Sequence, residues 1–164
     1  MSSTPSWWTM TRYSDAVLSM LLWVWGGAAY FLMEVGGKTW RGHPESISWT
    51  MLVVAVLLCV PIERAGEQLP WECPLWLQAL ACAALVTIVE LTAGLLLNVV
   101  LNLCIWDYSG LPFNLWGQIC PQFSPLWFAL CLVFIPVFDW LRYAVQGGER
   151  PSYRINPLKG VILK

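Results

Sequence analysis

One acid in a long apolar segment and the polar loop after it carry the side chains best suited to chemistry. The loop Trp106–Cys120 holds an acid, a phenol and an amide at Asp107, Tyr108 and Asn114. The preceding apolar segment contains Glu90. A carboxylate inside a membrane segment is costly to bury, so it marks a functional site by default. Together these groups could bind a cation, a proton or a polar head group, or could act as acid–base catalysts.

The composition places these groups in an integral membrane protein. Of the 164 residues, 58% are hydrophobic and 12% are charged, against about 25% charged in soluble domains. Many of the twelve tryptophans lie near the ends of apolar runs, as in an aromatic belt at the two membrane interfaces. The net charge of −1 provides no broad basic face, so we expect contact with the lipid bilayer and no nucleic acid.

Four apolar segments are long enough, or nearly so, to cross a bilayer as α-helices. We expect them at about residues 16–35, 47–62, 75–103 and 126–143. The predicted fold class is an all-α integral membrane protein. It is a four-transmembrane-helix bundle with a polar, partly membrane-embedded loop between helices 3 and 4. Residues 1–145 would form this membrane domain and residues 146–164 a polar cytoplasmic tail.

The positions of Lys and Arg predict the orientation, because basic residues gather on the cytoplasmic side. Seven of the nine would lie on the side of the two termini: Arg12, Arg64, Arg142, Arg150, Arg154, Lys159 and Lys164. Only Lys38 and Arg41 would lie on the other side. We therefore expect a multi-pass protein of the plasma membrane with both termini cytoplasmic and the polar loop facing outward.

Small and polar residues share one face of two predicted spans, since an α-helix turns 100° per residue. The third span carries Thr87, Glu90, Gly94, Asn98 and Asn102, and the first carries Ser19, Trp23, Gly26, Tyr30, Glu34 and Gly37. Such faces suit helix packing in lipid, so we expect them to meet or to line one cavity. Glu34, Glu90 and Asn98 are therefore site candidates. Alternatively, Glu34 is simply interfacial, and Glu90 only holds the bundle together through a hydrogen bond to Asn98 or to another helix.

A second polar set is expected at the cytoplasmic ends of the spans: Glu63, Arg64, Asp139 and Arg142. Asp139 and Arg142 are three positions apart on one helix and can pair locally. Interfacial ion pairing is the simplest interpretation of this set.

Two cysteines flank the polar loop. Cys104 and Cys120 could form a disulfide if the loop faces an oxidising compartment, although their spacing alone does not fix the geometry.

Several of these residues follow the pattern of a known family. The matching residues are Glu34 at the end of the first span, Arg41 and Gly42 after it, Glu90 and Gly94 in the third span, and Trp106, Asp107, Tyr108, Ser109, Pro112, Asn114 and Gly117 in the loop. Over roughly residues 20–130 the chain resembles the ABC-transporter type IV family of CmpB-like small membrane proteins. It also resembles their vertebrate relatives, the transmembrane protein 229 group. It departs from the pattern at Tyr30 and Phe31 and at residues 43–46.

The resemblance implies a transport-related, permease-like subunit with an intramembrane carboxylate site. No GxxxxGK[ST] motif is present, so the chain itself does not hydrolyse ATP. We expect a homo-oligomer or partner membrane subunits, because four short spans make a poor pore. The alternatives are a membrane scaffold and a membrane-embedded enzyme acting on a lipid or isoprenoid head group. In such an enzyme Glu34, Glu90 and Asp107 would act as acid–base groups or bind Mg²⁺ or Ca²⁺. The sequence specifies neither a cofactor nor a metal.

The predicted topology can be tested by single-cysteine labelling in intact cells, in a Cys-free background. A cysteine at Ser46 should react with an impermeant reagent, and one at Ser152 should be protected. The opposite pattern would show that the orientation is wrong.

Overall fold

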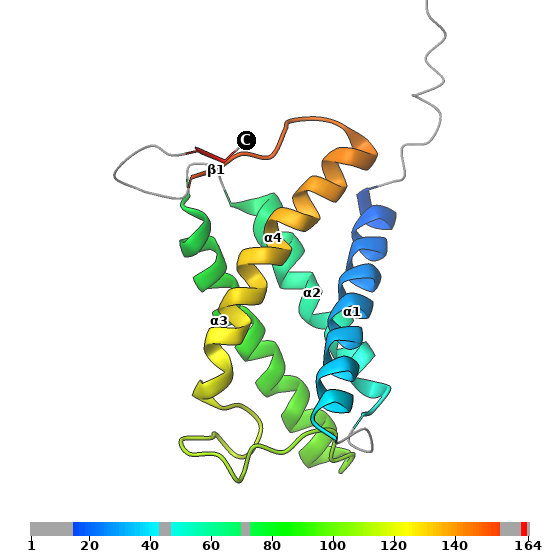
Figure 1. Cartoon of the computed structure of the whole chain (residues 1–164), viewed down its shortest axis with the longest axis vertical. Helices are drawn as coiled ribbons and strands as arrows, with labels where there is room; N and C mark the ends of the chain where they lie inside the picture. Colours follow the sequence, from blue (N-terminus) through cyan, green and yellow to red (C-terminus); the bar gives the residue numbers. More distant parts are fainter. Residues whose placement is uncertain (1–14, 43–46, 70–72, 155–161, 164) are drawn as a thin grey trace, which may run out of the picture.

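The computed structural model describes residues 15–42, 47–69, 73–154 and 162–163. Within them the chain folds into a bundle of four α-helices: α1 Asp15–Trp40, α2 Thr50–Gln68, α3 Leu75–Gly94 and α4 Ser124–Gln146 (Figure 1). The loop between α3 and α4 lies at one end of the bundle, which we call the loop end. α1 begins at the opposite end, the tail end. The basic residues Arg12, Lys159 and Lys164 and the loop residues 43–46 lie outside the described part.

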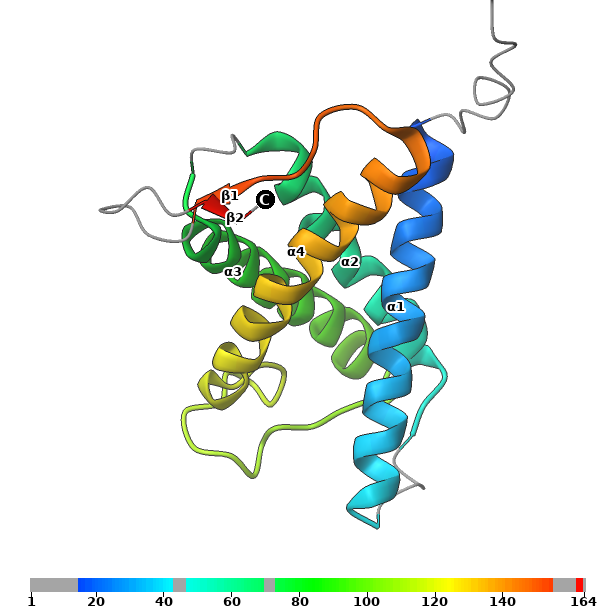
Figure 2. The same ribbon diagram turned by 45° about the horizontal axis from the view of Figure 1, so that its top comes forward.

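Short elements complete the chain. A π-helix, η3 Leu95–Val100, continues α3, and a 3₁₀ turn, η4 Pro121–Phe123, leads into α4. The span expected over residues 75–103 is thus a continuous helical segment, Leu75–Val100, whose last turns have π instead of α geometry. At the tail end, β1 Tyr153–Arg154 pairs antiparallel with β2 Ile162–Leu163. Figure 2 shows these strands over the end where α2 finishes and α3 begins.

Three helical segments of the described residues are long and apolar enough to cross a membrane: Asp15–Trp40, Leu75–Val100 and Pro121–Gln146. α2 is not among them. It has 19 residues and carries Pro61 inside the helix and the charged pair Glu63 and Arg64. The sequence prediction of an all-helical integral membrane protein is confirmed.

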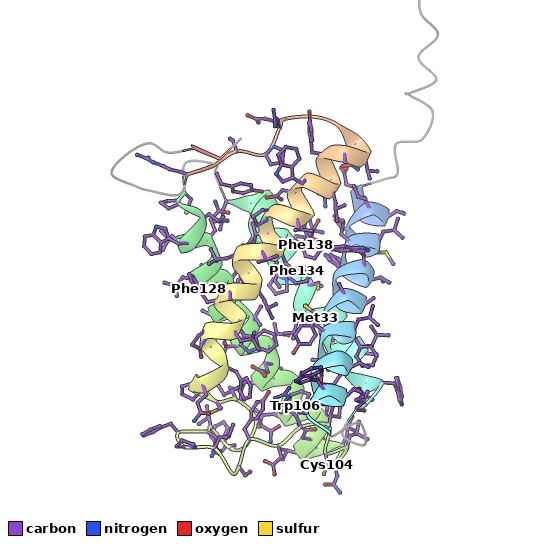
Figure 3. The ribbon with its side chains drawn as sticks, in the orientation of Figure 1. Met33, Cys104, Trp106, Phe128, Phe134 and Phe138 are labelled. Carbon is purple, nitrogen blue, oxygen red and sulfur yellow. The ribbon has the colours of Figure 1, made fainter. Side chains whose placement is uncertain are left out.

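The bundle core lies between α2 and the other three helices. α1 packs mainly on α2, and α3 packs on α4 and α2. Phe134 and Phe138 of α4 lie between α4 and α1 (Figure 3), where both make edge contacts with the ring of Trp25 at centroid distances of 6.4 and 6.3 Å. α1 and α3 each pack on α2 and on α4 in this arrangement.

The tail after α4 contacts the bundle. Tyr153 is 3% exposed and belongs to the hydrophobic core, and its phenol donates a short hydrogen bond to Asp139 of α4. Burial and the neighbouring Asp139 carboxylate raise the pKa of Tyr153. Arg150 lies over the Trp140 ring, 5.2 Å from its centroid. α4 ends at Gln146, and of the described residues after it Pro151 and Tyr153 are buried against the bundle.

The close approach of α1 and α2 depends on Gly27. A Cβ at this position would lie 2.7 Å from the backbone nitrogen of Val56 and 2.8 Å from its Cα. Gly27→Ala should therefore lower the free energy of unfolding by about 1–3 kcal/mol, the usual cost of overpacking. Unfolding in mixed detergent, followed by circular dichroism, measures this.

Gly36→Ala is the matched control in the same helix, because a Cβ there meets nothing within 4 Å. It should leave stability unchanged or raise it slightly, since Ala favours helix over Gly. Equal effects of the two substitutions would refute the close-packing account.

Candidate functional site

The loop between α3 and α4 is held in shape by its own side chains. Asp107 Oδ1 accepts hydrogen bonds from the backbone nitrogen of Ser109 at 2.8 Å and from its Oγ at 2.6 Å. These bonds hold the pKa of Asp107 below its ordinary value. Asn114 donates to the carbonyl of Leu111 at 2.8 Å and accepts from the nitrogen of Gly117 at 2.8 Å. Asp107 is exposed and Asn114 is half-buried, and both stabilise turns of the loop.

Asn98 fastens the loop to the end of the third membrane helix. Its Oδ1 accepts from the nitrogen of Ile105 at 2.7 Å, and its Nδ2 donates to the carbonyl of Trp106 at 3.0 Å and to Gln118 Oε1 at 2.9 Å. Trp106 Nε1 in turn donates to the carbonyl of Gln118 at 2.9 Å. Asn98 therefore satisfies backbone groups that would lack partners in the hydrocarbon region of a membrane. Asn102, predicted on the same face, is instead exposed beyond the helix with φ 52°.

Gly94 lets this loop lie directly on the helix. A Cβ at Gly94 would lie 2.6 Å from Gln118 Oε1 and 3.1 Å from an atom of the Trp106 ring. Gly94 is one turn after Glu90, so the loop and the buried acid meet the same face of α3.

Glu90 lies at the centre of the candidate site. Its side chain is 5% exposed, and each carboxylate oxygen accepts one hydrogen bond. Tyr108 Oη of the loop donates to Oε1 at 3.2 Å, and Trp127 Nε1 of α4 donates to Oε2 at 2.8 Å. The expectation that Glu90 faces protein and not lipid is confirmed. Its partners are Tyr108 and Trp127; no hydrogen bond links it to Asn98 in the described part.

Tyr108 is fixed on two sides. Its ring stacks on Phe123 of η4, with centroids 4.7 Å apart. Burial and the adjacent charge of Glu90 raise the pKa of Tyr108, so the phenol stays protonated and available as a donor at neutral pH. Tyr108 thus connects the loop to the acid of α3.

A cavity of about 380 Å³ opens at the loop end, on the other side of Tyr108 and Trp127. It is lined by aromatic, apolar and charged side chains: Tyr30, Met33, Glu34, Lys38, Arg41, Met51, Trp106, Tyr108, Phe123, Leu126, Trp127 and Leu130. Figure 3 labels Met33 and Trp106 of this set. Glu90 lies behind the wall that Tyr108 and Trp127 form.

Glu34 supplies the acid of the cavity. Its Oε1 forms an ion pair with Lys38 Nζ at 2.7 Å, one turn further along α1. Its Oε2 is buried and has no hydrogen-bond partner in the described structure. Glu34 and Glu90 are thus placed on two sides of the same wall. Asp107 is not directed into the cavity, because it is exposed and bonds to Ser109.

The predicted polar set at the opposite end forms a second cluster, centred on Glu63 of α2. Glu63 is 1% exposed and accepts from Ser19 Oγ at 2.9 Å and from Trp23 Nε1 at 3.2 Å. Arg142 donates a short hydrogen bond to Glu63 Oε1, and Arg64 lies 3.7 Å from Oε2. Arg142 also donates to Ser19 Oγ at 2.9 Å, so its described contacts reach both α2 and α1. The local pair between Asp139 and Arg142 stays a prediction.

Sequence reasoning missed most of the donors to these acids. Trp127 was not among the predicted site residues, and Ser19 and Trp23 were expected only as members of a helix face. The available signal was chemical, since a buried indole N–H needs an acceptor.

Two further expectations concern cysteines and metals. Cys104 and Cys120 are free thiols in the structure: Cys104 is exposed at the edge of the loop end (Figure 3), and Cys120 is buried with its Sγ 3.5 Å from the carbonyl of Pro112. The suggested disulfide is absent from this structure and stays a prediction for a loop that faces an oxidising compartment. Among the described residues, no group of three or more His, Cys, Asp or Glu side chains could hold a metal ion, so Glu34, Glu90 and Asp107 do not gather into the metal site considered for an enzyme.

The fold and the site define a small helical membrane protein with a buried carboxylate under a structured loop. The family model described as "Putative ABC-transporter type IV" matches residues 46–146, and the chain belongs to this family. The match includes Glu63, Glu90 and the whole loop, whereas Glu34 in α1 precedes it. No solved structure matches the chain.

The packing of the loop on Gly94 gives a testable expectation. Gly94→Ala should push Gln118 and Trp106 away and loosen the loop, so that limited proteolysis between residues 107 and 116 becomes faster. Gly110→Ala is the control within the loop, because a Cβ there meets nothing within 4 Å. Unchanged cleavage in Gly94→Ala would show that the loop does not depend on this contact.

Proposed function

We propose that this chain is a transport-related, permease-like membrane subunit whose site is built around Glu90 at the loop end. The proposal includes four crossings, with α2 as the second, both termini in the cytoplasm, and the plasma membrane as its location. The loop end then faces outward. Membership of the ABC-transporter type IV family supports the class, and the paired carboxylate beside a cavity supports the site.

The observation that carries the proposal is the position of Glu90 between two hydrogen-bond donors from different elements. Tyr108 belongs to the loop and Trp127 to α4, and both hydrogen bonds end on one carboxylate. Hydrogen bonds to a charged group contribute about 1.5–3 kcal/mol each. A change in the charge of Glu90 would therefore alter the position of the loop and of α4 together. The same two side chains form the cavity wall, so such a change would also reshape the cavity.

In this proposal the energy source lies outside the 164 residues of this sequence. The sequence has no phosphate-binding GxxxxGK[ST] loop, which an ATP-hydrolysing subunit needs to hold the nucleotide phosphates. We infer that the subunit works with an ATP-hydrolysing partner, in a complex that contains further membrane subunits or further copies of this chain.

The experiment is purification of the tagged chain from its native membranes in mild detergent, followed by measurement of ATP hydrolysis in the eluate. Wild-type protein should bring down an ATP-hydrolysing partner. Glu90→Gln keeps the shape of the side chain but removes its charge. It should retain the partner and lower ATP hydrolysis about tenfold, the effect of roughly 1.4 kcal/mol on a rate.

Glu149→Gln is the control, because Glu149 is an exposed acid of the tail. It should behave as wild type, and Tyr108→Phe should resemble Glu90→Gln. The proposal fails if no ATPase is recovered, or if Glu90→Gln and Tyr108→Phe hydrolyse ATP at the wild-type rate.

A further inference from the structure

We propose that the loop-end cavity binds a small amphipathic zwitterion, in which a protonated primary amine lies close to an acidic group. This inference deepens the function proposed above, because it names the class of molecule that the cavity would take. It rests on three features of the cavity: an acid with an unsatisfied oxygen, a pair of basic side chains, and a wall of aromatic rings.

The unsatisfied oxygen of Glu34 calls for an N–H donor. Lys38 occupies Oε1 at 2.7 Å, whereas Oε2 is buried with no hydrogen-bond partner in the described structure. Leaving a buried acceptor without a donor costs about 1–3 kcal/mol, and more when the group is charged. A protonated amine supplies both the hydrogen and the opposite charge. A quaternary ammonium lacks the hydrogen, and an anion would be repelled by Glu34.

Two basic side chains at the cavity mouth call for an acidic group. Lys38 lies in the last turn of α1, Arg41 directly follows the helix, and both side chains line the cavity. Arg41 uses Nε to donate to the carbonyl of Gly37 at 3.1 Å, which leaves the two terminal nitrogens of its guanidinium to bind a carboxylate or phosphate in bidentate fashion. Among the described lining residues, one acid stands beside two bases, so these side chains together carry a net charge of +1 and would disfavour a simple cation.

The walls select for an apolar part next to the charged groups. Tyr30 and Trp127 face each other with ring centroids 5.7 Å apart, and Met33, Leu126 and Leu130 extend the apolar surface. Aromatic faces also attract an ammonium group within about 6 Å of a ring centroid. A volume of about 380 Å³ lies at the lower end of the range for small-molecule sites. It would hold an amino acid or the head group of one lipid.

These two sources share the chemistry that the cavity recognises. A free amino acid with an apolar side chain has an amine and a carboxylate on one carbon. A phosphatidylethanolamine head group has an amine and a phosphate two carbons apart, with its acyl chains left in the bilayer. The experiment therefore includes an arm for each.

The test is isothermal titration of the full-length protein in detergent with four probes. Dihexanoylphosphatidylethanolamine is compared with dihexanoylphosphatidylcholine, which keeps the phosphate and the positive charge but has no N–H. L-leucine is compared with 4-methylpentanoate, which keeps the carboxylate and the apolar chain but has no amine. Binding of either zwitterion at least tenfold tighter than its analogue supports the proposal and identifies the source.

Variants of Glu34 and Arg41 show which side chain binds the amine and which binds the acidic group of the ligand. In Glu34→Gln, the affinities for each zwitterion and for its analogue, which lacks the amine or carries a quaternary ammonium, should differ by no more than about twofold. Arg41→Gln should weaken the binding of the zwitterion and of its analogue alike, so that the ratio of the two affinities stays the same. Glu149→Gln should bind as wild type, and thermal melting by circular dichroism checks that each variant is folded.

Equal binding of each zwitterion and its analogue by wild-type protein, or no binding of either zwitterion, would overturn the proposal. The result is separable from the transport proposal, because titration needs neither a partner nor ATP. If the protein binds a zwitterion selectively but no ATPase co-purifies, the proposed ligand class stands and the proposed transport function fails. If ATP hydrolysis depends on Glu90 but neither zwitterion binds selectively, the transport proposal stands and the proposed ligand class fails.

Discussion

Buried carboxylates in this bundle are stable only because other elements supply donors to them, and much of the arrangement follows from that need. Isolated charges are far too costly to bury. Glu90 therefore draws Tyr108 of the loop and Trp127 of α4 onto α3, and Glu63 draws Arg142 of α4 onto α2. Each acid joins elements that lie far apart in the sequence, one near each end of the bundle. Losing a single partner of a buried pair costs several kcal/mol, so these two acids are as important to the architecture as the apolar core.

The sequence predicted the helices well because their apolar runs are long and because proline and glycine mark several ends. It also predicted that Glu90 would be buried, since the helical period places it with Gly94 and Asn98. It did not predict the π-helix, because no residue in Leu95–Val100 is specific to that geometry. The predicted position of Asn102 failed for this reason: a periodic face assumes that the α-helix continues.

The sequence predicted where the site lies better than it predicted which residues form it. The polar loop and Glu90 were expected to lie near each other, and Tyr108 joins them. Asp107 and Asn114 were equally plausible members by residue type, yet they satisfy turns within the loop, which short-range geometry decides. Trp127 and the cavity that holds Glu34 depend on how α4 packs beside α1. Contacts between helices so distant in sequence leave no periodic signal in either one.

The π-helical turn has a consequence for how the chain tolerates changes in length. A π-helix bonds each residue to the fifth one along, so it contains one residue more per turn than an α-helix needs. Removing one residue from Leu95–Val100 would restore regular α geometry with little loss of hydrogen bonding. Because the π turn already holds the extra residue, its removal would leave the phase of the chain after it nearly unchanged. A deletion in the regular part of α3, between Glu90 and Gly94, would instead rotate everything after it by about 100° around the helix axis and would move Tyr108 away from Glu90. The π turn is thus the place in this helix where the chain can change in length with the least effect on the contact between phenol and carboxylate.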